Sequence, residues 1–233
     1  MRAIAIVQAR FGSMRFPGKM LQFLGHFPIL HWVLHRVNRA KGIHKVILAT
    51  SDHPRDLPLK KVADEIGVET FFGDEQDVLH RFSEAAKGHD ANAVIRICGD
   101  NPFICPIEIE RLVRFHRDND YSYSFNHQDR LGSGYADGFG AEIMDYALLE
   151  ELNRNVRHRD EREHLTLNIW RQADAATKIG ILAAPRELAF PDLRFDIDEP
   201  ADLVNLLKLC DAGINLESTA TEIVQLHHEL LKE

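Results

Sequence analysis

The sequence predicts an α/β protein, a three-layer α/β/α sandwich built on a mostly parallel sheet. Three short runs are almost entirely apolar, as is typical of strands covered on both faces: residues 3–7, 45–50 and 93–98. Segments of helical period separate these runs, so strands and helices alternate along the chain. The chain has 233 residues, of which 45% are hydrophobic and 27% charged, and we expect one domain over residues 1–233.

The other elements follow from local patterns and turn residues. An apolar stripe predicts a helix over 28–41, which Gly42 ends. Asp77 and Asp145 each precede a helical segment and are expected to cap it. We predict further helices at 57–66, 78–87, 106–117, 146–155, 157–170, 200–209 and 218–231, and further strands at 68–72, 121–125, 178–183 and around 195–198. Residues 137–143 are expected to be extended, with Gly138 and Gly140 allowing close backbone approach.

The loop after the first strand has the composition of a phosphate-binding loop. Its turn formers are Gly12, Pro17 and Gly18, and its polar residues are Arg10, Ser13, Arg15 and Lys19. Backbone N–H groups, a hydroxyl and clustered cations suit a polyphosphate. The spacing is neither that of a P-loop nor that of a G-x-G-x-x-G turn. From these residues alone, an ordinary surface loop with solvated charges remains the alternative.

The charge is distributed unevenly along the chain. The net charge is -8, yet no acidic residue precedes Asp52, so residues 1–51 carry +8 and the rest -16. This pattern fits a small anionic ligand held by the N-terminal part, with later acids as metal ligands. The acidic bulk argues against nucleic acid or an anionic membrane as partner.

The sequence also bears on the compartment. We find neither an apolar run of membrane-spanning length nor the form of a signal peptide, and we expect a cytoplasmic protein. The three cysteines, Cys98, Cys105 and Cys210, have neither disulfide nor zinc spacing, and reduced thiols fit this expectation.

Acidic residues follow the strands at the edge where open α/β sheets bind ligands. Asp100 leaves the third apolar strand in G-D-N-P, and a turn residue is the alternative role. Asp196 and Asp198 alternate with Phe195 and Ile197, so both carboxylates should share one face. Two acids on one face repel each other unless a cation or donor lies there.

Several polar positions keep two interpretations. Thr50, Ser51 and Asp52 lie at the end of the second apolar strand and could contact a ligand or form a loop and helix cap. Arg81 is expected as a solvated surface charge, whereas Arg96, in an apolar strand, should be paired or face a site. The charged run 157–164 is typical of a solvated helix face, and 126–136 of a loop over the site or a disordered connection.

Taken together, these segments resemble the cytidylyltransferase family that activates acidic sugars. The chain is most similar to the branch of the spore-coat polysaccharide biosynthesis protein F, and less so to the CMP-Kdo and CMP-neuraminate synthetases. The motifs that carry the resemblance are Q-A-R-F-G-S-M-R-F-P-G-K (8–19), L-A-T-S-D (48–52), G-D-E-Q-D-V-L-H-R-F (73–82), R-I-C-G-D-N-P (96–102), D-G-F (137–139), E-R-E-H-L-T (161–166) and D-E-P-A-D-L (198–203).

The resemblance implies a nucleotide-diphosphosugar transferase-like, Rossmann-like fold. It implies a nucleotide-binding half over about 1–105, a sugar-binding half over about 106–210 and a C-terminal helix over 211–233. By the same resemblance, the catalytic residues would be Arg10, Arg15, Lys19 and Asp100, and the ligands of Mg²⁺ would be Asp100 and Asp198. The nucleotide would contact Ala9, Arg10, Gly12, Ser13, Lys19, Thr50, Ser51, Arg81, Arg96 and Gly99. The sugar would lie near Asp137, Glu142 and His164.

The implied reaction transfers CMP from CTP to an acidic 2-keto sugar and releases pyrophosphate, in surface polysaccharide biosynthesis. A homodimer is a further expectation from the family. Relatives of the Kdo type carry Gln where this chain has Cys98, so the strict choice of cytosine is open. Two alternatives remain, a glycosyltransferase of the related nucleotide-sugar fold and a non-catalytic nucleotide-binding module.

Overall fold

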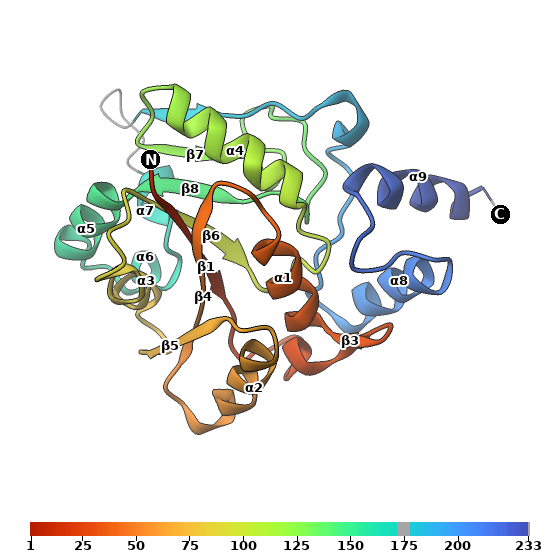
Figure 1. The fold of residues 1–233 in the computed structure, drawn as a ribbon, viewed down its shortest axis with the longest axis horizontal. Helices are drawn as coiled ribbons and strands as arrows, with labels where there is room; N and C mark the ends of the chain where they lie inside the picture. Colours follow the sequence, from red (N-terminus) through yellow and green to blue (C-terminus); the bar gives the residue numbers. More distant parts are fainter. Residues whose placement is uncertain (172–177, 233) are drawn as a thin grey trace.

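One seven-stranded sheet runs through the middle of the molecule, with helices on both sides (Figure 1). The structure is a computed structural model and describes residues 1–171 and 178–232. The strand order is β5-β4-β1-β6-β8-β7-β9. The strands are β1 (Ala3–Gln8), β4 (Ile43–Ser51), β5 (Glu69–Gly73), β6 (Ala93–Cys98), β7 (Tyr123–Phe125), β8 (Glu142–Asp145) and β9 (Ile179–Ile181). Among these, only β8 runs antiparallel to its neighbours, which confirms the predicted mostly parallel sheet.

The helices form the two outer layers. Helices α1 (Ile29–Asn38), α2 (Leu57–Glu65) and α4 (Pro106–Asp118) pack on one face of the sheet. Helices α3 (Val78–Ala86), α5 (Tyr146–Asn155), α6 (Arg159–Glu163) and α7 (Leu167–Arg171) cover the other. Helices α8 (Pro200–Asp211) and α9 (Ala220–Leu230) lie beyond α1, at the right of Figure 1. The short elements are the hairpin β2 (Phe23–Leu24) and β3 (Phe27–Pro28), and the 3-10 turns η1 (Lys19–Leu21), η2 (Pro54–Asp56) and η3 (Arg186–Leu188). None of the helices in the described ranges has the length and apolarity needed to cross a membrane.

Each face of the sheet has its own hydrophobic core. Along β1, Ala3, Ala5 and Val7 belong to one core and Ile4 and Ile6 to the other, because successive side chains point to opposite faces. Burial on both faces explains why the sequence of β1 shows no polar alternation.

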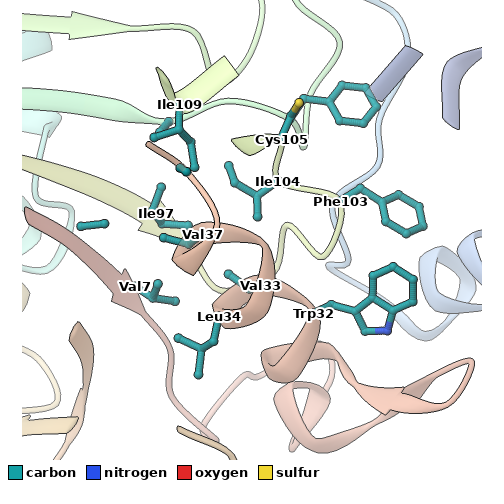
Figure 2. Close-up of a cluster of buried hydrophobic side chains, with 14 of the residues drawn as sticks. Val7, Trp32, Val33, Leu34, Val37, Ile97, Phe103, Ile104, Cys105 and Ile109 are labelled. Carbon is teal, nitrogen blue, oxygen red and sulfur yellow. The ribbon is translucent and has the colours of Figure 1, made fainter. Parts of the chain in front are cut away.

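Figure 2 shows the core beneath α1, where Val33 and Val37 face Ile97 of β6. Trp32 packs edge-on against Phe103, with ring centroids 5.6 Å apart. Its indole Nε1 donates a 2.8 Å hydrogen bond to the carbonyl of Leu24, so this tryptophan is fully engaged in the core.

The strand directions bring several loops to one edge of the sheet. Strands β1, β4 and β6 are parallel, so their carboxyl ends meet there. Because β8 runs the other way, it begins at this edge, with Glu142 directly opposite Arg96 of β6. The fold therefore gathers residues from distant parts of the chain at a single edge.

The predicted helix over 157–170 is wrong as a single element. It is divided into α6 and α7, and His164 between them has φ -104° and ψ 83°, outside the helical region. The charged and apolar pattern alone did not reveal this break, which places His164 at a bend.

Two further local predictions are corrected. Around 195–198 no strand forms, although Arg194 makes an isolated bridge to Asp137 and burial alternates as predicted. Asp145 occupies the N-cap position of α5 without a side-chain capping bond. Its carboxylate lies instead 3.3 Å from Nε2 of the buried His116. By contrast, Asp77 caps α3 as predicted, through a 2.9 Å bond from the N–H of His80.

Gly138 and Gly140 lie where the backbone of 137–141 passes two other segments. A Cβ at Gly140 would lie 1.9 Å from the carbonyl oxygen of Asn126, and one at Gly138 2.9 Å from the carbonyl carbon of Phe195. Gly138 also has φ +106°. The predicted close approach is confirmed at both positions.

We predict that Gly140→Ala lowers the free energy of unfolding by about 3 kcal/mol, since the backbone oxygen of Asn126 cannot move aside without shifting the chain at the end of β7. Gly67→Ala is the control: its Cβ meets open space, and the cost comes only from φ +72°, at about 1–2 kcal/mol. Chemical denaturation of both variants measures the difference. Equal losses would show that the contact with Asn126 relaxes freely.

Candidate active site

A cavity of about 390 Å³ opens at the edge of the sheet where β6 ends and β8 begins. Its lining is mostly polar and comes from β6, the loop 126–136, α7 and the segment 194–198. The lining residues are Arg96, Cys98, Asp100, Asn101, His127, Gln128, Arg130, Asp137, Glu142, His164, Thr166, Leu167, Trp170, Arg194, Asp196 and Asp198. Six of the residues predicted for the metal, nucleotide and sugar therefore meet at one cavity: Asp100, Asp198, Arg96, Asp137, Glu142 and His164.

Lys19 joins the N-terminal loop to two carboxylates of the cavity. Its ammonium Nζ donates to Asp100 Oδ2 at 3.0 Å and to the carbonyl oxygen of Ile197 at 2.6 Å. The same Nζ lies 3.6 Å from Asp198 Oδ1. Lys19 is 8% exposed, so this charge is held in the interior only because it is paired.

The other loop cations also reach carboxylates. Arg15 Nη2 lies 2.8 Å from Asp198 Oδ1, and Arg10 Nη2 lies 3.2 Å from Glu163 Oε1 of α6. The Ser13 hydroxyl accepts a 3.2 Å hydrogen bond from the N–H of Phe16, within the loop. The predicted polyphosphate contacts of these residues stay predictions, but the loop does present three cations toward the acidic segments.

Asp56 anchors the loop and was missed by sequence reasoning. Its fully buried carboxylate accepts from the N–H of Phe11 at 2.7 Å, from the N–H of Ser51 at 3.2 Å and from both hydroxyls of Thr50 and Ser51. These hydroxyls therefore support the loop, and a nucleotide contact by Thr50 or Ser51 stays a prediction. An acid just ahead of a helix resembles an ordinary cap, so its sequence context carried no signal.

Arg81 is buried, which corrects its expected position as a solvated surface charge. It is 1% exposed, and its Nη1 donates to the carbonyl oxygen of Asp74 at 2.7 Å. Its Nε and Nη2 have no hydrogen-bond partner among the described residues. Burial, together with the nearby Arg10 guanidinium, lowers the pKa of Arg81 to about 10. A buried cation with two free donors next to a second cation is an arrangement that an anion would complete.

Arg96 pairs with Glu142 across two strands and also lines the cavity. The two residues are direct neighbours in the β6–β8 register, and Arg96 Nη1 donates to Glu142 Oε2. The Tyr123 hydroxyl donates to the other carboxylate oxygen. Burial alone would raise the pKa of Glu142, but the Arg96 guanidinium outweighs it and lowers the pKa to about 2. The prediction that Arg96 is paired or faces a site is confirmed in both parts.

Gly99 lets the Asp100 turn approach the end of β1. A Cβ at Gly99 would lie 2.7 Å from the carbonyl oxygen of Gln8 and 3.0 Å from the Cβ of Ala9. The carbonyl of Asp100 accepts from the N–H of Ile197 at 2.9 Å, which fixes the 194–198 segment beside it. This packing brings the carboxylates of Asp100 and Asp198 to the same ammonium group.

Asp137 and Asp196 add two more carboxylates to the cavity. Arg194 holds Asp196 through two hydrogen bonds of 3.0 and 2.6 Å and lies 3.4 Å from Asp198. Burial and the Asp196 charge raise the pKa of Asp137 to about 7. Ionisation of the Asp137 carboxyl is thus costly.

Residues 157–160 and 164 of the charged run are exposed, as its composition predicted for a solvated face, whereas residues 161–163 pack against the protein. Arg162 donates to the carboxylate of Asp77 at 2.8 Å and to Asn153 and Val156 of the neighbouring helix. Glu161 is 6% exposed and accepts from Asn168 at 2.9 Å. These contacts fix α6 against α3 and α5, and they present Glu163 to Arg10.

Part of the cavity lining is formed by residues that sequence reasoning did not single out. The loop 126–136 contributes His127, Gln128 and Arg130, and α7 contributes Trp170. The prediction that this loop lies over the site is confirmed. Arg130 and Trp170 come from separate elements, so no local sequence signal links them.

Asp100 and Asp198 are the side chains that could hold a metal ion. Within the described residues, no group of three or more His, Cys, Asp or Glu has the arrangement of a metal site. Two carboxylates that already hold one ammonium nevertheless fit Mg²⁺, because Mg²⁺ is usually bound by one or two carboxylates together with water and substrate phosphates.

Comparison with known proteins gives consistent matches. A family model described as cytidylyltransferase matches residues 4–176. The chain is 32% identical over 229 residues to the spore coat polysaccharide biosynthesis protein SpsF of Bacillus subtilis, a match that covers 95% of this chain and 92% of that protein.

Solved structures agree with the sequence matches. A cytidylyltransferase from Leptospira borgpetersenii is 26% identical, with a TM-score of 0.90, and the match covers 100% of this chain and 96% of that one. A CMP:2-keto-3-deoxy-manno-octonic acid synthetase in complex with CTP is 19% identical, with a TM-score of 0.69 and coverage of 92% and 100%. The second likeness concerns the fold alone, and both confirm the predicted architecture.

We predict that Asp137→Asn raises the melting temperature more at pH 8 than at pH 5, measured in EDTA. The folded-state pKa of about 7 lies above the ordinary value of 3.8, so the stability that protonated Asp137 contributes is lost as the pH rises through 7. Asparagine cannot ionise and avoids this loss; each kcal/mol regained corresponds to about 2–4 °C. The same change at both pH values would contradict a raised pKa at this carboxyl.

We predict that Arg81→Met leaves the melting temperature of the free protein nearly unchanged but abolishes its rise with inorganic pyrophosphate or CTP. An apolar side chain of similar size removes two unpaired buried donors, and such replacements are often neutral or stabilising. Thermal shift assays with and without ligand test both parts. A large loss of stability with an intact ligand shift would show that Arg81 serves the fold alone.

Proposed function

The chain belongs to the cytidylyltransferase family, and we propose that it transfers CMP from CTP to a hydroxyl of an acidic 2-keto sugar, with release of pyrophosphate. The family supports a nucleotidyltransferase. The similarity to SpsF, a spore coat polysaccharide biosynthesis protein, supports a role in the biosynthesis of a surface polysaccharide.

One observation carries the proposal: the Lys19 ammonium lies between Asp100 and Asp198, beside the N-terminal loop. The arrangement brings a phosphate-type loop and two carboxylates together around a single cation. Nucleotidyl transfer needs both components, cations for the leaving pyrophosphate and carboxylates for a divalent cation. The CTP complex of the structurally similar synthetase gives CTP further support as the nucleotide.

The metal in this proposal is Mg²⁺, held by Asp100 and Asp198. When bound, Mg²⁺ would neutralise phosphate charge and orient the reacting oxygens. In the free protein Arg15, Lys19 and Arg194 occupy these carboxylates, so their side chains would have to shift toward the phosphates.

In the proposed reaction the acceptor hydroxyl attacks the α-phosphorus in line. The bond from that phosphorus to the β-phosphate oxygen breaks, and pyrophosphate leaves. Arg10, Arg15 and Lys19 would stabilise the charge that develops on the leaving group, with Arg81 behind the loop as a further donor. Asp137, Glu142 and His164, which also line the cavity, would lie toward the sugar.

We predict that Lys19→Ala and Asp100→Asn each lower the rate of CTP-dependent pyrophosphate release by ~10²–10³. Each variant removes one charge from the group that would surround the phosphates and metal. The assay measures pyrophosphate release in the presence of Mg²⁺. Each of the four nucleoside triphosphates is combined in turn with each member of a panel of 2-keto sugar acids and neutral sugars. Lys60→Ala, on the exposed face of α2, is the matched control and should retain full activity.

Near-wild-type turnover in either variant would contradict the assigned roles. If the wild-type protein releases no pyrophosphate with any substrate of the panel, and no nucleotide raises its melting temperature, the proposed transferase activity is refuted. Stabilisation by CTP with Mg²⁺ but no release with any acceptor would favour the non-catalytic module.

A further inference from the structure

One wall of the cavity carries the cation Arg130, and this wall is built on aromatic rings. The Cζ atom of Arg130 lies 4.3 Å from the ring centroid of Trp170. Trp170 is itself held edge-on by Tyr123 and Phe125 of β7, at 5.6 and 5.2 Å. The guanidinium therefore rests on a supported platform, which lowers the entropy lost when it binds a ligand.

Arg130 differs from the other two arginines that line the cavity. Arg96 is paired with Glu142, and Arg194 holds Asp196 through two bonds. Arg130 has no carboxylate partner among the residues that the structure describes, and its backbone N–H, not its side chain, bonds Ser133. Its charge is thus available to a ligand in the cavity.

Two neutral polar groups lie on the same wall and also lack partners. His127 Nδ1 and Trp170 Nε1 form no hydrogen bond within the described part of the chain. Burial lowers the pKa of His127, so its ring is neutral at pH 7 and can serve a hydroxyl or a carboxylate oxygen. A ligand rich in oxygen atoms would satisfy these groups.

A second, acidic wall of the cavity would repel an anion. Asp100, Asp137, Asp196 and Asp198 line it, and these acids come from the end of β6 and from segments around 137 and 194–198. An acceptor that carries a negative group is therefore oriented, with that group toward Arg130 and its hydroxyls toward the carboxylates.

We propose that Arg130, braced by Trp170, selects an acidic acceptor by binding its carboxylate. The guanidinium offers paired N–H donors that match the two oxygens of a carboxylate. This inference rests on the proposed function for its acceptor but assigns Arg130 no part in binding CTP. A neutral sugar of the same shape would lack this contact.

The test measures binding without turnover. Kdo, N-acetylneuraminate and their carboxamides are titrated while tryptophan emission is recorded. The chain has two tryptophans, and Trp32 is buried in the core beneath α1, so Trp170→Phe identifies the signal from the cavity. We expect the wild-type protein to bind at least one of the two acids about 10–100-fold more tightly than its carboxamide.

Arg130→Gln should abolish this preference, so that acid and carboxamide bind alike, and Arg130→Lys should keep part of it. Arg114→Gln is the control, because Arg114 is exposed on α4 and lies outside the cavity; it should behave like wild type. Equal affinity of the wild-type protein for acid and carboxamide, the absence of binding by both acids, or a preference that survives Arg130→Gln would overturn the proposal.

Kinetics separates this proposal from the proposed function. With an acid that supports pyrophosphate release, Arg130→Gln should raise the KM for the acid about 10–100-fold and leave the KM for CTP unchanged. An unchanged KM for the acid would overturn the role of Arg130 while the transferase stands. Selective binding of acids without any release would support Arg130 and count against the transferase.

Discussion

The buried ammonium of Lys19 ties together three segments that are far apart in the sequence. Lys19 closes the loop after β1, Asp100 follows β6, and the carbonyl of Ile197 and the carboxylate of Asp198 precede α8. A lysine this deeply buried is stable only while its charge is matched, and loss of one partner leaves the others uncompensated. The positions of the loop after β1, the turn at Asp100 and the segment before α8 therefore depend on one another, and together they determine the shape of the cavity.

The uneven distribution of charge along the sequence has a structural reason. Four aspartates crowd one wall of the cavity, and carboxylates so close together repel unless cations lie among them. Arg15 and Lys19 of the N-terminal part meet this need, with help from Arg194. The first 51 residues lack acids, which leaves these cations free to face carboxylates from later segments.

Strands were predictable because burial on both faces leaves an unbroken apolar run, and β6 has the predicted bounds. Asp100 was predictable because strand ends meet at one edge, whereas Asp198 reaches that edge on a segment that forms no strand. Arg81 was not predictable, since its burial depends on tertiary packing, in which it bonds the carbonyl of Asp74 in the loop before α3. The pair of Arg130 and Trp170 was also hidden: forty positions separate them, and only the packing of α7 on β7 brings them together.

Because β8 runs antiparallel to its neighbours, it divides the sheet into two parts, and these two parts differ in how freely their connecting loops can change in length and sequence. Strands β5, β4, β1 and β6 form one part, and β8, β7 and β9 the other, joined where Arg96 faces Glu142. The loop 126–136 begins after β7 and returns before β8, so insertions or deletions there leave the register of β1, β4 and β6 untouched. In the proposed reaction, remodelling this one loop would change the acceptor specificity while the nucleotide chemistry stays constant.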